Sequence, residues 1–135
     1  MGAKLLMHIL LVWVIFLIFF ILNAGVRNAV ITPRYGEHTG HIVSTITGII
    51  AILVGTFIFI RVTNTAYTRT ALILIGVIWV VLTIAFEFTF GHFVMKQPWS
   101  RLLADYNILK GRIWVLIPLT EFISPTLISH IIGKR

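Results

Sequence analysis

Four long runs of apolar residues, separated by short polar connections, make up most of the chain. They cover residues 5–26, 42–62, 71–95 and 113–132. As a helix, each run is long enough to cross the ~30 Å of hydrocarbon in a bilayer. The connections leave no room for a separate soluble domain. The pattern therefore predicts one domain over 1–135, an all-α membrane protein with four transmembrane helices in an up-down bundle.

The connection between the third and fourth runs has a helical pattern of its own. Pro98 suits the first turn of a helix and Gly111 suits its end. The residues that recur at helical spacing are Trp99, Leu102, Leu103, Tyr106 and Leu109. We expect an interfacial amphipathic helix over 98–110, lying in the headgroup plane. It is either a connector anchored by its aromatic residues or a lid that turns polar side chains over a site.

Composition supports the membrane class. The chain is 59% hydrophobic and 11% charged, whereas soluble domains are about 25% charged. The first run follows Lys4, as a signal peptide would, but it exceeds the 7–15 apolar residues typical of one, so we predict a retained span. The absence of cysteine excludes disulfides and thiolate metal sites.

The net charge of +7 arises from basic residues that flank the apolar runs. In that position they meet lipid phosphates and influence orientation, so we expect a lipid bilayer as partner and no nucleic acid. Five Lys and Arg residues fall at the end that carries both termini and six at the other. Lys4 before the first helix favours cytoplasmic termini in a bacterial inner membrane. Insertion in both orientations would give the same balance, and we expect a homo-oligomer.

Two glutamates lie inside the apolar runs, Glu87 in the third and Glu121 in the fourth. A carboxylate near a bilayer centre costs ~2.5–3.5 kcal/mol on insertion scales, so such residues are commonly functional. Each lies eight residues from the same end of the bundle, roughly 12 Å deep. Because consecutive spans are antiparallel, the two carboxylates can meet at one level. Such a pair resists joint ionisation and holds a shared proton or a cation.

Other polar residues in the spans extend this candidate site. Thr83 shares the i, i+4 face of Glu87, and Asn23 interrupts the first run. His92 lies about 140° around the helix from Glu87. Either a local bulge brings His92 to the site or this residue serves the membrane interface. The expected proton- or ligand-binding residues are Glu87, Glu121, Asn23, Thr83 and His92.

Two prolines, Pro118 and Pro125, flank Glu121. Each removes a helical hydrogen bond, which frees carbonyls near positions 114 and 121. In lipid, such carbonyls must be satisfied by neighbours, water or a ligand. The segment is either a cation site of the broken-helix type or a kinked packing helix with Glu121 protonated.

The first connection contains a candidate metal site. His38 and His41 are three residues apart with Glu37 adjacent, a spacing that can hold zinc or iron, although loop histidines are commonly solvated. A divalent metal is therefore a candidate cofactor. His8 and His130 lie at similar depths, but nothing else supports a haem and none is expected. The charged residues expected to contact an anionic headgroup are Arg27, Arg34, Arg101, Asp105 and Arg112.

The stretch FEFTFGHFVMKQPWSRLLADYNILKGRIW, about a fifth of the chain, resembles small uncharacterised bacterial four-span membrane proteins, a group to which no activity is attached. In size and span number the chain is similar to the small multidrug-resistance transporters. That family uses a membrane-embedded glutamate and can insert in both directions. Its glutamate lies in the first span, which has none here, so the likeness is one of architecture.

Three functions are consistent with these features. The first is a transporter or ion-conducting oligomer that binds a proton, cation or small solute at Glu87 and Glu121. The second is a membrane-embedded, metal-dependent enzyme that acts on a lipid-like substrate. The third is a structural or accessory subunit whose buried glutamates pair with arginines. No complete nucleophile–base pair is apparent, and transport is the favoured hypothesis.

Overall fold

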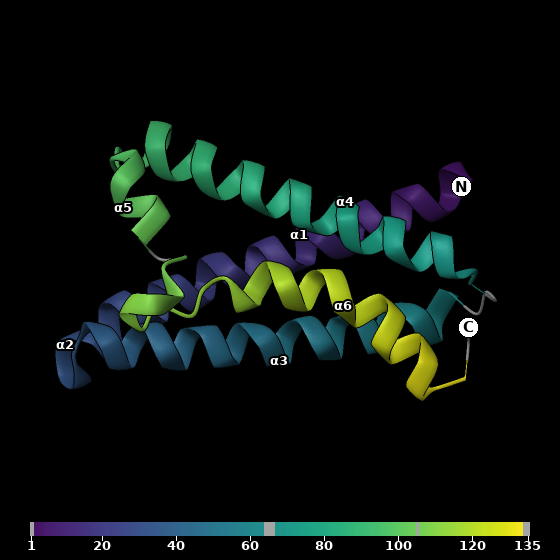
Figure 1. Cartoon of the computed structure of the whole chain (residues 1–135), viewed down its shortest axis with the longest axis horizontal. Coiled ribbons are helices and arrows are strands. Elements are labelled where there is room, and N and C mark those ends of the chain that lie inside the picture. Colours follow the sequence, from purple (N-terminus) through teal and green to yellow (C-terminus); the bar gives the residue numbers. More distant parts are fainter. Residues whose placement is uncertain (1, 64–66, 105, 134–135) are drawn as a thin grey trace.

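The computed structural model describes residues 2–63, 67–104 and 106–133, and helices dominate these ranges (Figure 1). In chain order the elements are α1 (Ala3–Val26), the π-helix η1 (Arg27–Ile31), α2 (Thr32–Tyr35), α3 (Glu37–Thr63), α4 (Arg69–Thr89), the π-helix η2 (Phe90–Val94), α5 (Trp99–Ala104), the 3-10 helix η3 (Ile108–Lys110) and α6 (Leu116–Ile131). No strand occurs in the described part of the chain.

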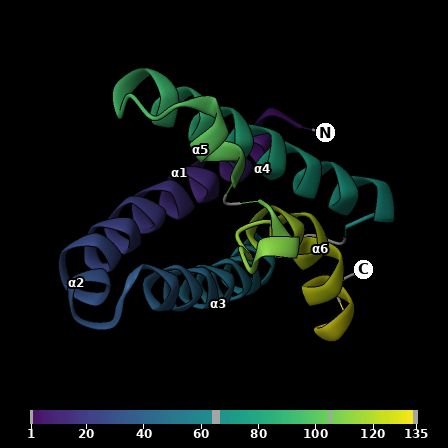
Figure 2. The ribbon, with the colours of Figure 1, turned by 60° about the vertical axis from the view of Figure 1, so that its left-hand side comes forward.

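The four longest helices, α1, α3, α4 and α6, run along the length of the molecule (Figure 1). Helix α1 begins and α6 ends at the same end of the bundle, and α2, α5 and η3 lie at the other. Helix α6 packs most extensively against α4 and α3. Helices α1 and α4 diverge toward the end that carries α2 and α5 (Figure 2). The prediction of an all-helical fold is confirmed for the described residues, in which the four long helices alternate in direction (Figure 1).

The four predicted runs correspond to these four helices, but the four helices differ in length. Of the residues described, three helical stretches are long and apolar enough to cross a membrane: Ala3–Tyr35, Glu37–Thr63 and Arg69–Val94. Helix α6 has 16 residues, or about 24 Å, and is shorter than the predicted run 113–132. Helix α6 begins later than the predicted run because the residues before it form turns. In these turns the carbonyls of Ile113 and Trp114 accept from the N–H groups of Leu116 and Ile117 at 3.0 and 2.9 Å.

The first connection was expected to be a loop, and this prediction was wrong. Helix α1 continues through η1 into α2, and α3 begins at Glu37. Pro33 follows η1 directly as the second residue of α2, and it has no N–H to donate to the preceding helical turn. The chain reverses at Gly36, whose φ of +96° is readily adopted only by glycine. A single residue therefore separates the two helical stretches.

The predicted interfacial helix over 98–110 is interrupted. Helix α5 ends at Ala104, and η3 is a separate turn that ends at Gly111, where φ is +82°. Between them Asn107 has non-helical backbone angles. The expected apolar face is only partly buried, because Leu102 contacts Gly91 while Leu109 is 94% exposed.

Small residues permit the closest helix contacts. A Cβ on Gly76 of α4 would lie 2.5 Å from the backbone oxygen of Phe122 on α6, so only glycine fits there without a shift. On α3, Gly48 and Gly55 instead face side chains, those of Ile117 and Phe16. These small residues of α3 thus pack within the bundle.

Candidate functional site

Glu121 lies on the face of α6 that is sealed between α3 and α4. Its side chain has no exposed surface, and neighbouring residues on that face, Ile117 and Ser124, are also buried. The hydroxyl of Thr83 donates to Glu121 Oε2 at 2.7 Å. The second oxygen, Oε1, is buried and has no hydrogen-bond partner among the described residues. One carboxylate oxygen is therefore available for a proton or a ligand.

Thr83 connects three helices at the level of Glu121. It lies on α4 and is 3% exposed. Its hydroxyl donates to Glu121 on α6 and accepts from the indole N–H of Trp13 on α1 at 3.1 Å. Because a hydroxyl has one proton, the Trp13 donor directs the proton of Thr83 toward Glu121.

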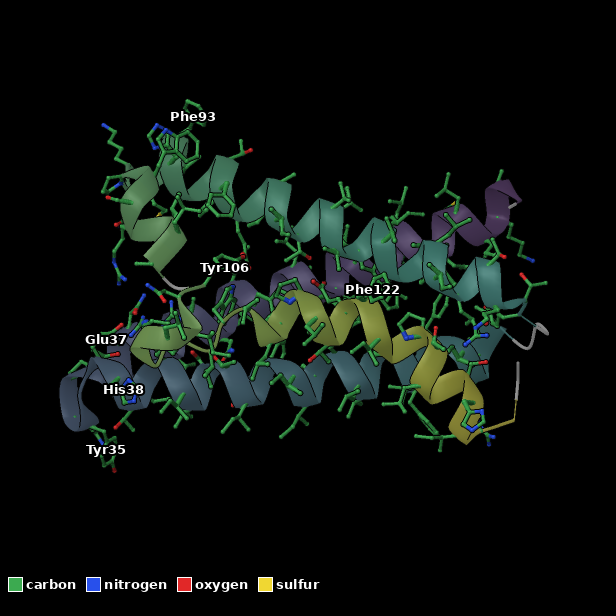
Figure 3. The ribbon with its side chains drawn as sticks, in the orientation of Figure 1. Tyr35, Glu37, His38, Phe93, Tyr106 and Phe122 are labelled. Atoms are coloured by element: carbon green, nitrogen blue, oxygen red, sulfur yellow. The ribbon has the colours of Figure 1, made fainter. Side chains whose placement is uncertain are left out.

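Glu87 lies one turn after Thr83 on α4 and is half-buried. Trp114 donates its indole N–H to Glu87 Oε1 at 2.8 Å, and the hydroxyl of Tyr106 donates to Oε2 (Figure 3). Both donors come from the connection between α4 and α6. Thr83, one turn before Glu87 on the same helix, contacts Glu121, so the two carboxylates lie near each other. Unlike Glu121, Glu87 has a donor on each oxygen.

Glu87 and Thr83 line a cleft of about 220 Å³ between α1 and α4. The ribbons of these two helices diverge at this end of the molecule (Figure 2). Its other polar lining residues are Asn23 and Arg27 of the α1–η1 helix. Half-exposed Ile21 also lines the cleft, which therefore reaches the outer apolar surface. The aromatic residues of its wall are Trp13, Phe20, Phe86, Phe88, Phe90, Tyr106 and Trp114.

Asn23 and Arg27 are one turn apart and both contact α3. The amide of Asn23 donates to the carbonyl of Ser44 at 2.8 Å, and Arg27 Nη1 donates to Ser44 Oγ at 3.3 Å. Four expected residues, Glu87, Thr83, Asn23 and Arg27, thus line one cleft, and Glu121 adjoins it through Thr83.

His92 does not line this cleft. The bulge considered from the sequence is present as η2, but the imidazole stacks on Trp99 at 3.7 Å, and its Nδ1 lies 2.9 Å from the carbonyl oxygen of Gln97. The bulge therefore does not bring His92 to the cleft, and the role at the membrane interface stays a prediction. Trp99 and Gln97 lie in the same connection, so His92 fixes the start of α5.

The candidate metal residues have separate contacts. Buried His41 accepts at Nε2 from the backbone N–H of Ile113 at 2.9 Å. Arg112 pairs with Glu37 through two hydrogen bonds of 2.7 Å. His38 is exposed (Figure 3). Within the described ranges, no three His, Asp or Glu residues are grouped as a metal site.

Arg112 affects the electrostatics of this end of the molecule. Its hydrogen bonds hold the pKa of Glu37 below the usual range, against a smaller opposing effect of burial. Glu37 lies outside the apolar run 42–62, and Arg101 is 3.9 Å from it. Arg34 is exposed, and Asp105 lies outside the described residues.

The two prolines differ in effect. Pro118 lies in the first turn of α6, and the carbonyl of Trp114 accepts from Ile117, so the expectation of a free carbonyl at 114 was wrong. Pro125 is inside the helix and has no N–H to offer the carbonyl of Glu121. Next to it, the Ser124 and Thr56 hydroxyls lie 3.0 Å apart.

The sequence did not identify Trp13 and Trp114 as residues of the candidate site. Both lie in apolar runs and look like packing or anchoring residues, but a buried indole N–H needs an acceptor. No protein-family model, curated protein or solved structure matches the chain, so these contacts are the basis of the functional argument.

Proposed function

We propose that the chain is an integral membrane protein that holds an exchangeable proton at Glu121 and Glu87 and moves it, alone or with a small solute. The observation that carries this proposal is Glu121 Oε1, a fully buried carboxylate oxygen without a described hydrogen-bond partner. Burying an ionised carboxylate with an unsatisfied oxygen is costly, and a bound proton or small cation removes that cost.

Membrane insertion is part of the proposal, and the distribution of side chains supports it. The interior of α3 contains Ser44, Thr45 and Thr56. The exterior is apolar, as in the stripe along α1 formed by Leu11, Ile15, Ile18 and Leu22. Such an outer surface suits lipid, and we propose that α6 completes a fourth span together with the turns before it. A bacterial inner membrane, cytoplasmic termini and a homo-oligomer remain predictions.

Proton exchange needs one carboxyl group that favours the protonated form and a neighbour that favours the ionised form, and Glu121 and Glu87 differ in this way. Glu87 faces the cleft and has a donor on each oxygen, an arrangement that suits the ionised form. Glu121 is sealed and has a single described donor, so the shared proton resides there. Thr83 lines the cleft one turn from Glu87 and donates to Glu121, and its remaining lone pair can accept a proton from the cleft as it passes its own proton on, which offers a short route to Glu121.

Infrared difference spectroscopy of the full chain in phospholipid bilayers tests this proposal. We expect a protonated-carboxyl band at neutral pH that disappears in Glu121→Gln and shifts in Glu87→Gln. A band that is lost on addition of sodium would identify a small cation as an alternative occupant. Glu37→Gln is the matched carboxyl control and should leave the band unchanged. The absence of the band, or a band insensitive to Glu121→Gln, would contradict the proposal.

A further inference from the structure

A groove between α1 and α3 lies at the end of the bundle where α1 begins (Figure 1). One wall of this α1–α3 groove is formed by residues between Gly2 and Phe16, and the other by residues between Gly55 and Thr63. Its volume is about 760 Å³, within the ~300–1,000 Å³ of small-molecule sites. Glu121 and Thr83 are not among its lining residues, so the groove is separate from the proposed proton site.

The body of the groove is apolar and open to the side. Leu11 and Ile15 line it, and each is more than half exposed. At its inner end the ring of Phe16 lies against Gly55, where an added Cβ would be 2.5 Å from that ring. The distance along α1 from Lys4 to Ile15 is roughly 16 Å, close to the ~15 Å of hydrocarbon in one leaflet of a bilayer. The groove therefore has the length and the lining that suit one acyl chain.

The outer end of the groove carries a positive charge. Lys4 lines it there, and His8, one turn further along α1, adds a ring N–H. No acidic residue is among the described residues that line the groove. The ion pairs found in the described ranges join Glu37 to Arg101 and Arg112 at the other end of the molecule, so they leave the charge of Lys4 uncompensated. An anionic group is the electrostatic complement of this end.

We propose that the α1–α3 groove binds an anionic glycerophospholipid, with one acyl chain between the helices and the phosphate beside Lys4. A small anion would contact Lys4 alone and leave the apolar walls uncovered, whereas a lipid covers both parts of the groove. A net negative headgroup is favoured over a zwitterionic one, because basic residues near the membrane surface attract net negative charge. The inference rests on the membrane insertion in the proposed function but not on proton exchange.

Photochemical labelling in nanodiscs tests this binding. The full chain is placed in phosphatidylcholine nanodiscs that contain increasing fractions of phosphatidylglycerol with a diazirine on one acyl chain. After illumination, the labelled peptides are quantified by mass spectrometry, and the series is repeated with phosphatidylcholine carrying the same diazirine. We expect saturable labelling of both walls of the groove, with about fivefold weaker apparent affinity for the phosphatidylcholine probe.

Two pairs of variants separate the groove from general membrane charge and bulk. Lys4→Gln should weaken labelling by phosphatidylglycerol about fivefold, whereas Arg69→Gln removes an exposed cation at the start of α4 and should have no effect. Val12→Phe fills the groove and should abolish saturation. Val14→Phe adds the same bulk to the same helix outside the groove and should preserve it. If Val12→Phe does not fold, Lys4→Gln, at an exposed position, still decides the matter.

Three results would overturn the inference: equal labelling by the two lipids, no effect of Lys4→Gln, or saturation retained in Val12→Phe. A second copy of the chain is the competing occupant. Because the chain has no cysteine, Leu11→Cys introduces a single thiol on the wall of the groove. An unlabelled groove in a chain whose Leu11→Cys variant is joined to a second copy by a bifunctional thiol reagent would identify that copy as the occupant and overturn lipid binding.

The same labelling distinguishes failure of this inference from failure of membrane insertion. Ile18 is 54% exposed on α1 and does not line the groove, so a lipid probe should label it without saturation. Labelling at Ile18 without lipid preference in the groove rejects only this inference. A chain that acyl-chain probes label nowhere on α1 would reject the proposed membrane insertion as well.

Discussion

The surroundings of Glu121 and Glu87 differ although the two residues are neighbours. Around Glu121, α4 and α6 are in backbone contact at Gly76 and Phe122, and the side chain has no exposed surface. Around Glu87, the α1 side of the bundle opens into a cleft, and the connection between α4 and α6 supplies two donors. The same chemical group is thus incompletely satisfied in the sealed region and well satisfied in the open one.

This difference shows that helix separation sets the hydrogen bonding of each carboxylate. Close packing excludes the donors that an ionised Glu121 would need, whereas divergence lets Tyr106 and Trp114 reach Glu87. Perturbing the sealed region should therefore lower the free energy of unfolding more than perturbing the open region.

The largest effect is expected for Gly76→Ala. The added Cβ would lie 2.5 Å from the backbone oxygen of Phe122, and a backbone atom cannot move aside cheaply. We expect a loss of about 3 kcal/mol, at the upper end for overpacking. The measurement is reversible unfolding in mixed detergent micelles. Gly25→Ala is the control, because nothing lies within 4 Å of its added Cβ. Equal stability of the two variants would contradict the close approach of α4 and α6.

Thr83→Val should cost about 2 kcal/mol, because it removes the described donor to Glu121 and the acceptor for Trp13 while it keeps the side-chain shape. Combination with Glu121→Gln tests the link directly. The two losses should be strongly non-additive, because each variant breaks the same contact. Thr47→Val, at a hydroxyl bonded to the backbone of its own helix, serves as the control. Additive losses would mean that Thr83 stabilises the fold without acting on Glu121.

Much of the fold could be predicted from the sequence. Four apolar runs are enough to predict four helices, and equal spacing from the connection places Glu87 and Glu121 at one level. The local start of α6 could not be predicted, because Trp114 and Val115 are as apolar as the helix that follows. The end of α5 could not be predicted either, because the helical spacing of apolar residues continues to Leu109 although the backbone does not remain helical.

The site was predicted in part. Intramembrane carboxylates and their i, i+4 neighbours are visible in the sequence because polar residues are rare in such runs. The donors to these groups cannot be recognised in the sequence, because Trp13 and Trp114 count as apolar in any hydrophobic pattern. Only the structure shows which acceptor each indole N–H contacts. The pairing of His41 with the backbone of Ile113 is equally invisible, since it joins positions far apart in the chain.

In the open region, Tyr106→Phe should cost about 1 kcal/mol, half the loss expected for Thr83→Val. Glu87 keeps the Trp114 donor, and the cleft gives its second oxygen access to other partners. The same micelle unfolding experiment measures this loss. Tyr35→Phe, at an exposed hydroxyl of the same end, provides the reference (Figure 3). A loss as large as that of Thr83→Val would show that Glu87 is as dependent on one donor as Glu121 is.

The smallest effect is expected at the surface, for Arg112→Gln. The paired Glu37 is half-exposed, so the loss at neutral pH should be about 0.5 kcal/mol despite two short hydrogen bonds. Because Arg112 lowers the pKa of Glu37, its stabilisation is present above the carboxyl's unfolded-state pKa and disappears as pH falls through the lowered value. Unfolding measured against pH should therefore show wild type and variant converging in acid. If the wild-type and variant curves of unfolding free energy against pH remain parallel in acid, Arg112 stabilises the protein through packing beside η3. In that case its effect does not depend on the charge of Glu37.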